Sequence, residues 1–411
     1  MLRLKKLFYA IVLILAMPFC STAQNVGFAA GTIPLDSLEN IAATSSLVRC
    51  RPLLLNKKVI GIGEATHGSR EFVWIKSKFF LFLNRDLGAN ELLMEIPFSV
   101  APYITDYING ESSFSFIDSL LKPAKTIHSK EFFAFLDTLR EINAAKAATA
   151  KIRIWGIDVD QFYDYAVARL KKIAGNAGKS YQQQLDEITV VIPQNYKKVS
   201  RFSKEYRTPA IQEAINKIDS FFSSIQSKLG VDDIFIATNC IKQLRDSYEY
   251  WGAGNNSFAN RDKLMADNIQ LIQKYCSSET VMVWAHNLHI KKNAAGVKMM
   301  GELLAERYGQ EYFAIGSVFK EGSFRVWYKG VLSQNKVDAS GSGEFALFLD
   351  KAAPGNYFFA TTQLQSFFNK NSVMVYDVGI MQAVAASKVT LHPFKDFDAY
   401  FYLDSISAFD L

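Results

Sequence analysis

Short apolar runs recur along the chain, each bounded by polar residues or glycine. Runs that are apolar at every position are typical of strands buried on both faces of a parallel sheet. A helical pattern separates the first two runs, and the resulting order of strand, helix and strand predicts a βαβ unit with a right-handed crossover. The runs predict strands over 58–64, 92–97, 151–158, 280–286, 312–319, 324–328, 357–361 and 373–378.

Apolar residues at helical spacing predict helices between these strands. Ser69 is suited to the N-cap of a helix over 70–87, and Gly88 is suited to end that helix. From 162 to 275 the helical spacing continues without a strand pattern, so an inserted helical segment is expected there. The helices predicted outside that segment cover 70–87, 129–147 and 299–308, and its own last helix covers 260–275.

The whole pattern predicts an α/β fold, a three-layer α/β/α sandwich with a mainly parallel sheet and an inserted all-helical cap domain. The chain is longer than one small core requires. The predicted organisation is a signal peptide over 1–23, the first part of the α/β domain over 24–161, the helical cap over 162–275 and the second part of the α/β domain over 276–411.

The N-terminal residues have the pattern of an export leader. A basic start precedes an apolar run over 7–19, which is shorter than the roughly 20 residues that span a bilayer. Cleavage after Ala23 fits the rule of small residues, with Ser21 two positions before it. Lipid anchoring at Cys20 is not expected, because Phe19 stands where such sites favour a small residue. The leader predicts a periplasmic or extracellular protein without a stable membrane span.

Charge and cysteine content narrow the classes of partner. The net charge is +6, and part of that excess lies in the leader. The densest basic stretch, 195–207, is interleaved with aromatic residues and is interpreted as the solvated side of a helix, so nucleic acid is not an expected partner.

Three cysteines, Cys50, Cys240 and Cys276, remain after the leader, without CxxC spacing. We interpret them as buried small side chains, while one disulfide plus a free thiol stays open.

Residues with acid–base chemistry follow four of the predicted strands. In open parallel sheets, ligands bind beyond the carboxyl ends of the strands. Three of the chain's five histidines fall in two of these loops. Acids and imidazoles need partners when they are buried, so their clustering favours a site over simple packing. The residues are Glu64 and His67 after the first strand, Glu95 at the second, Asp158 at the third, and His286 and His289 after the fourth.

This set of residues suits the activation of water. Histidine is the usual general base near neutral pH, and a neighbouring carboxylate fixes its tautomer. His67 with Glu64 or Glu95 is the candidate base, and His286 or His289 would stabilise an oxyanion or protonate the leaving group. Covalent serine catalysis is disfavoured because no GxSxG motif joins a strand to a helix.

Two questions stay open at the level of the residues. His67, Glu95 and His286 could instead hold a divalent metal ion, since Zn²⁺ accepts mixed nitrogen and oxygen ligands. Arg261 either points back to the cleft or forms a cap or surface pair with Asp262. No glycine loop of the Walker or dinucleotide type follows the first strand, so no phosphate-bearing cofactor is expected.

At these residues the chain resembles the erythromycin esterase family. The resemblance runs in order through nearly the whole length after the leader. It is carried by GIGEATHGSREF over 61–72, Met94-Glu95, WGID over 155–158, Asn260-Arg261-Asp262 with Met265-Ala266 and Asn268, WAHNLH over 284–289, and Met300-Gly301 with Leu304, Gly309 and Tyr312.

The resemblance implies a hydrolase that cleaves a carboxylic ester, such as a macrolactone, by direct attack of water, in a reaction that is independent of metal ions or only weakly affected by them. It implies that His67 is the general base, that Glu64 and Glu95 are the essential acids, and that His286 and His289 form the second histidine site. Lys76 matches a basic position that is often arginine in the family, and lysine lacks the planar fork of arginine.

Two other functions remain as alternatives. One is a divalent-metal-dependent hydrolase or peptidase, and the other is a non-catalytic binding protein for haem or a similar ligand, because related folds include both. The predicted leader also makes a role in antibiotic resistance unexpected, because macrolide-inactivating members act where the drug meets the ribosome. The expected partner is a small-molecule ester, and the sequence indicates no oligomeric state.

Overall fold

The computed structural model describes residues 27–122, 127–160, 163–193, 207–250, 257–276, 278–293, 296–328, 331–339, 343–379 and 388–411. The predicted signal peptide over 1–23, with Cys20, lies outside the described residues, as does all but the last residue of the basic stretch 195–207. Within the described ranges, no helix is both long and apolar enough to cross a bilayer.

The described chain is built on one large, mainly parallel sheet, as predicted. Its strands lie in the order β1-β8-β11-β6-β2-β5-β3-β4, with β7 paired to β6. The parallel strands are β2 (Val59–Ile62), β3 (Glu91–Pro97), β4 (Arg153–Asp158), β5 (Val281–Trp284), β6 (Tyr312–Tyr328) and β11 (Ala399–Ile406). The antiparallel strands are β1 (Ile33–Pro34), β7 (Val331–Val337) and β8 (Tyr357–Ala360).

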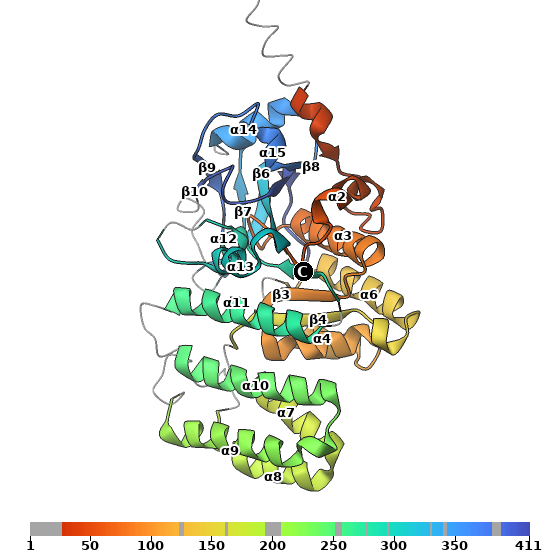
Figure 1. Ribbon diagram of the computed structural model, residues 1–411, viewed down its shortest axis with the longest axis vertical. Coiled ribbons are helices and arrows are strands. Elements are labelled where there is room, and N and C mark those ends of the chain that lie inside the picture. The colour runs from red at the N-terminus through yellow and green to blue at the C-terminus, as the bar shows by residue number, and fades with distance from the viewer. Residues whose placement is uncertain are drawn as a thin grey trace, which may run out of the picture.

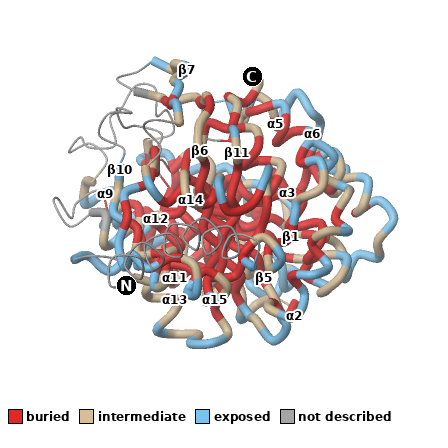
Figure 2. The backbone as a smooth tube through the Cα atoms, turned by 90° about the horizontal axis from the view of Figure 1, so that it is seen from above, coloured by how far each residue is buried: buried red, intermediate tan, exposed pale blue. Residues whose placement is uncertain are grey.

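Alternate residues of each central strand face two separate cores. In β5, Val281 and Val283 pack in one core, while Met282 and Trp284 pack in the other. Because successive side chains of a strand point to opposite faces, a strand buried on both sides reads as a continuous apolar run. This is the pattern from which the strands were predicted, and Figure 2 shows buried residues concentrated in the middle of the molecule.

Helices cover both faces of the sheet, which gives the predicted α/β/α layers (Figure 1). One face packs against α2 (Arg51–Leu54), α3 (Arg70–Leu87), α4 (Ala101–Ile108), α5 (Phe114–Leu121) and α6 (Lys130–Ala144). The other packs against α11 (Ser257–Tyr275), α12 (Asn287–Ile290), α13 (Met300–Tyr308), α14 (Gly343–Ala352) and α15 (Thr361–Leu364). Single 3-10 turns lie at Ser45–Cys50, Phe98–Val100, Ala148–Ala150, Gln226–Lys228 and Gly309–Glu311.

Every regular element that the structure describes within 162–275 is a helix. Its helices are α7 (Asp164–Ala177), α8 (Lys179–Thr189), α9 (Pro209–Ile225), α10 (Val231–Tyr250) and α11. Figure 1 shows α7 to α10 stacked at one end of the molecule, with α11 between them and the sheet. Helix α11 packs directly against β4, and it therefore brings its own side chains to the sheet edge.

The strands differ from the prediction at several places, and the short or edge strands β1, β7 and β10 (Lys388–Leu391) were not predicted. The predicted strands over 312–319 and 324–328 form one continuous strand, β6, because both halves find partners, β11 and β7. The strand predicted over 373–378 is β9 (Val373–Tyr376), but it pairs with β10 in a separate two-stranded sheet. Strand β11 lies in the middle of the main sheet and was not predicted, although its residues 399–402 are aromatic and apolar.

The hydrogen bonding of Ser69 at the N-terminus of α3 also differs from the prediction. Helix α3 begins after Ser69 and ends at Gly88, which has a φ of 69°, as predicted. The Ser69 hydroxyl donates to Glu71 Oε2 at 2.7 Å and makes no capping hydrogen bond to the helix. Among the described cysteines, Cys50 and Cys240 are buried, Cys276 is partly buried, and none forms a disulfide.

Candidate active site

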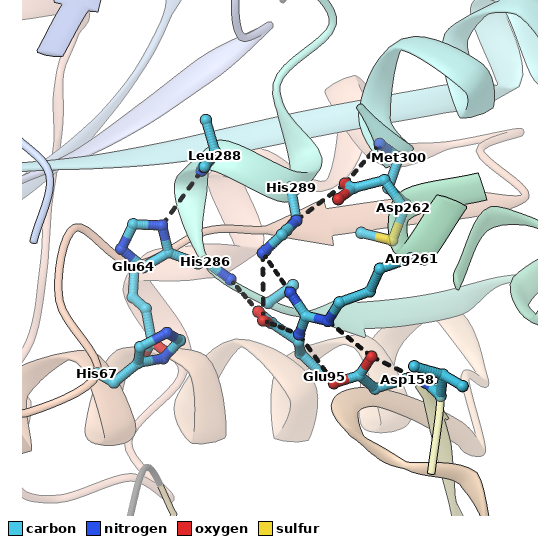
Figure 3. Close-up of polar contacts among 12 residues, drawn as sticks. Glu64, His67, Glu95, Asp158, Arg261, Asp262, His286, Leu288, His289 and Met300 are labelled. Atoms are coloured by element: carbon cyan, nitrogen blue, oxygen red, sulfur yellow. Dashed lines mark hydrogen bonds and ion pairs between the residues drawn. The ribbon is translucent and has the colours of Figure 1, made fainter. Parts of the chain in front are cut away.

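The strand order brings the predicted residues together at one edge of the sheet. Strand β5 lies between β2 and β3, and β4 lies beside β3. The carboxyl ends of these parallel strands therefore follow one another in space as Asp158, Glu95, His286 and Glu64. Figure 3 shows these side chains converging with His67, His289 and Arg261. The site is a single polar cluster assembled from the ends of four strands and from the helices that follow or cover them.

Two glycines allow this close assembly. A Cβ at Gly63 would lie 2.3 Å from Asn287 Oδ1, and one at Gly156 would lie 2.3 Å from the carbonyl oxygen of Pro97. The second contact accompanies a register shift between β3 and β4, between Met94 and Pro97, which places Glu95 beyond the regular pairing. Any larger residue at either position would push the loops of the site apart.

Glu64 is held between a lysine and a histidine. Its Oε2 lies 2.7 Å from Lys76 Nζ, and its Oε1 lies 2.6 Å from His67 Nδ1. Lys76 comes from α3 and is fully buried, and its Nζ also lies 4.7 Å from the centre of the Trp284 ring. The predicted basic residue therefore reaches the site as a single point charge on one carboxylate oxygen, a contact that needs no planar fork.

The charges of Glu64 and Lys76 depend on each other. Burial raises the pKa of Glu64, but the Lys76 ammonium and the hydrogen bond with His67 outweigh it and hold that pKa below its ordinary value. Burial lowers the pKa of Lys76 to about 8 against the opposing effect of Glu64. Glu64 is consequently an anion at neutral pH, and it accepts the Nδ1–H of His67.

His67 is left with one nitrogen free for chemistry. Because Nδ1 carries the proton shared with Glu64, Nε2 of the neutral ring is an acceptor. Within the described parts of the chain, no protein group is hydrogen-bonded to that Nε2. The His67 side chain keeps 12% of its surface exposed, whereas those of His286 and His289 keep 6% each. His67 is thus the imidazole of the site that solvent reaches best.

Arg261 joins the two acids on the other side of the site. Its Nε and Nη2 donate to the two oxygens of Asp158, both at 2.8 Å, and Nη2 also donates to Glu95 Oε1 at 2.8 Å. Burial opposes the charge, but Asp158 and Glu95 raise the pKa of Arg261 well above its ordinary value. Of the two orientations left open by the sequence, Arg261 takes the one that points into the site.

Asp262, the next residue, pairs with His289 instead. His289 Nδ1 lies 2.9 Å from Asp262 Oδ1, and its Nε2 lies 3.3 Å from Glu95 Oε1. Burial alone would lower the pKa of His289, but Glu95 and Asp262 raise it to about 10. His289 is therefore an imidazolium at neutral pH, although its Nε2 also lies only 3.1 Å from Arg261 Nη1. Three carboxylates around these two cations offset their repulsion.

This charge state predicts how stability changes with pH. An ordinary histidine has a pKa of about 6.5, so between that pH and about 10 the folded protein holds a proton that the unfolded chain releases. The stabilisation is complete below pH 6.5 and is lost as the pH rises through about 10. Urea denaturation between pH 6 and 10 should show the free energy of unfolding of the wild type losing more with rising pH than that of His289→Asn. The comparison is needed because the lowered pKa of Lys76, about 8, acts in the opposite direction above that pH.

His392→Asn is the matched control, since its ring Nδ1 binds a backbone carbonyl and the ring pairs with no carboxylate among the described residues. It should keep the slope of the wild type. An equal pH dependence of the free energy of unfolding in the wild type and in His289→Asn would show that His289 is neutral in the folded protein.

His286 has a different environment from His289. Its Nδ1 accepts a hydrogen bond from the Leu288 backbone N–H at 3.3 Å, and its ring centre lies 4.9 Å from that of His67. Its backbone N–H donates to Glu95 Oε2 at 2.9 Å. Burial, together with the proximity of His67, holds the pKa of His286 well below its ordinary value, so the ring is neutral.

Asp377 is a member of the site that the sequence did not identify. Its Oδ1 lies 3.4 Å from His286 Nε2, and burial raises the pKa of this carboxyl to about 8. Asp377 also lines a cavity together with Asn287, Lys291 and Tyr400. One signal was present, because an acidic residue interrupts the apolar run over 373–378. Asp262 was named only as a surface partner, and its contact with His289 could not be foreseen.

The residues do not fit the alternative metal set. In the described residues, no three His, Cys, Asp or Glu side chains are arranged to hold one ion. Of the predicted ligands, Glu95 accepts from Arg261 and His286 N–H with its two oxygens, and His286 Nδ1 accepts from Leu288. A metal ion would have to displace these bonds, and we derive no step through one.

Comparison with known proteins gives the family. The erythromycin esterase family profile matches residues 87–406, which include every site residue after α3. The Bacillus subtilis (strain 168) protein YbfO, named as a candidate hydrolase, is 22% identical over 320 residues, 69% of this chain and 69% of that protein. The erythromycin esterase type II of Escherichia coli is 23% identical over 317 residues, 68% of this chain and 73% of that protein.

Solved structures share the fold. A Bacillus cereus protein superposes with a TM-score of 0.79 at 18% identity, covering 95% of this chain and 98% of that one. A mutant of the erythromycin esterase EreC in its open conformation superposes with a TM-score of 0.67 at 16% identity, covering 92% of this chain and 99% of that one. At these identities the structures show the fold alone. Because the profile matches well over half of the sequence, the chain belongs to the erythromycin esterase family.

Proposed function

We propose that this hydrolase cleaves a carboxylic ester, such as a lactone, with a water molecule activated by His67. Membership of the family and the similarity to YbfO support hydrolysis. The geometry of His67 supports its role as the base that activates water. Its Nδ1 is bound to Glu64 at 2.6 Å, and its Nε2 is unpaired among the described residues. His67 is also the most exposed imidazole of the site. This is the arrangement that a general base requires.

The proposed reaction has two steps. In the first, His67 Nε2 takes a proton from water while the water oxygen bonds to the carbonyl carbon, and the carbonyl oxygen becomes an oxyanion. In the second, the carbon–oxygen bond to the leaving group breaks and His67 returns its proton to the leaving alkoxide. The products are a carboxylic acid and an alcohol. Glu64 remains an anion throughout and stabilises the imidazolium of His67.

Arg261 is the group best placed to stabilise the oxyanion. Its Nε and Nη2 hydrogens are taken by Asp158 and Glu95, whereas Nη1 donates to no carboxylate among the described residues and has His289 Nε2 as its neighbour at 3.1 Å. Its side chain is 19% exposed, more than any other cation of the cluster. Nη1 can therefore donate to a substrate oxygen without releasing its structural partners.

We also propose that the enzyme acts outside the cytoplasm, because residues 1–23 have the pattern of an export leader.

The experiment that tests the proposed activity is hydrolysis of a panel of aryl esters, lactones and macrolides by purified protein from residue 24 onward, with and without a chelator. We expect turnover of at least one ester that persists with chelator. Turnover abolished by chelator and restored by a divalent metal would favour the metal-dependent alternative.

A further inference from the structure

Two buried polar atoms of the site face each other without a hydrogen bond. They are His286 Nε2 and Asp377 Oδ1, which lie 3.4 Å apart. Neither has another hydrogen-bond partner within the described part of the protein, and the two residues are only 5% and 7% exposed. Buried polar groups are rarely left unpaired, so this pair requires an explanation.

The proton of the His286 ring can be placed from its other contact. The Leu288 N–H donates to Nδ1, so Nδ1 carries no hydrogen, and a neutral ring must then carry its proton on Nε2. That N–H faces Asp377 Oδ1, an acceptor whether or not the carboxyl is ionised. Catalytic hydrogen bonds are often long in the free enzyme and shorten when substrate binds.

The backbone attaches Asp377 to the same loop that carries His67. Thr66 forms a parallel bridge with Val378, and the Val378 N–H donates to the Ala65 carbonyl at 2.6 Å. The segment after β9 is therefore linked to His67 in two ways. Its backbone pairs with the residues just before His67, and its Asp377 faces His286, whose ring packs against the His67 ring. These contacts lie outside the main sheet, in a part of the chain that the reaction above does not use.

We propose that Asp377 is a positioning residue that accepts the Nε2–H of His286 and so holds the ring that packs against His67. The Asp377 carboxyl oxygen sets the rotation of the His286 ring, and the ring limits the rotation of His67. Its effect on turnover rests on the proposed function, whereas the hydrogen bond itself does not. The consequence is that His286 is oriented by Asp377 and is not available as a second base.

The kinetic test compares two substitutions at one position. Asp377→Ala removes the acceptor and should lower kcat by about 10- to 100-fold with KM changed less than about twofold, because small displacements of a catalytic group reduce turnover strongly. Asp377→Asn keeps an acceptor oxygen of the same shape and should restore kcat to within about threefold of the wild type. Asp404→Ala, on β11 with a side chain that is 44% exposed, is the matched control and should leave kcat unchanged.

The second test reads the hydrogen bond without any substrate. The chain has five histidines, so long-range proton–nitrogen spectra of protein with ¹⁵N-labelled histidine can resolve them, and His286→Asn assigns the signal. We expect His286 to be fixed as the neutral Nε2–H tautomer with a slowly exchanging ring proton. Asp377→Ala should speed that exchange markedly, and Asp377→Asn should not.

The two tests distinguish failure of the positioning role of Asp377 from failure of the proposed esterase function. A wild type that turns over esters, with Asp377→Ala equal to it, overturns the positioning role and leaves the proposed function standing. A wild type that hydrolyses no ester on the panel removes the proposed function, and the spectra still decide on the hydrogen bond. An Nδ1–H tautomer in the wild type, or unchanged proton exchange in Asp377→Ala, overturns the inference even if that variant is less stable.

Discussion

Replacement of His67 by alanine should reduce kcat for ester hydrolysis by about 10²- to 10⁴-fold, the range that a general base contributes. Of the three imidazoles of the site, only His67 combines a ring nitrogen unpaired among the described residues with a carboxylate partner at 2.6 Å and access to solvent. The other two imidazoles cannot replace it, because His286 faces Asp377 and His289 is held between two carboxylates. The loss should appear in kcat more than in KM.

The control and the rescue make this prediction specific. His128 also pairs with a carboxylate, Asp118 at 2.9 Å, and its side chain is 15% exposed, but it lies outside the site. His128→Ala should therefore keep full activity. Added imidazole should restore part of the activity of His67→Ala, because the missing base leaves an accessible space. Activity of His67→Ala within about threefold of the wild type would assign the base to another group.

Replacement of Arg261 by methionine should lower the free energy of unfolding by about 3–5 kcal/mol, as expected when one partner of a buried ion pair is removed. The change leaves Asp158 and Glu95, with side chains 8% and 10% exposed, without the cation that neutralises them. His289 would remain the only cation in direct contact with Glu95 among the described residues. Urea denaturation at pH 7 measures the effect.

Arg245 provides the matched comparison. It pairs with Asp219 at 2.6 Å, but the two side chains are 43% and 47% exposed, so Arg245→Met should cost about 0–1 kcal/mol. Arg261→Lys keeps the charge without the planar fork and should fall between the wild type and Arg261→Met. An equal loss of unfolding free energy in Arg261→Met and Arg245→Met would show that burial does not make the ion pairs of Arg261 more important for stability than an exposed pair.

The strands that form the site were readable because they are buried on both faces. A central parallel strand such as β5 is apolar at every position, so a polar residue near the end of such a run stands out. Glu64, Glu95, Asp158 and His286 are therefore visible in the sequence as the ends of apolar runs. Their presence in one cluster was predicted and is observed, while their catalytic roles stay predictions.

The contacts among these residues were not readable. Arg261 is 103 residues from Asp158 and 166 from Glu95, and only the packing of α11 against β4 brings its side chain to them. The neighbouring Asp262 could equally have paired with Arg261 or with solvent. Likewise, the strand over 373–378 was predicted, but not that it leaves the main sheet and presents Asp377 to His286.

The sequence by itself determined most of the central strands, the long helices and the polar residues at the strand ends, because periodicity and capping act between residues close along the chain. Only the tertiary structure decided the order of the strands, the insertion of β5 between β2 and β3, and the partner of each charged side chain. Those features depend on pairings between distant segments, and a local pattern carries no information about which distant segment lies beside it.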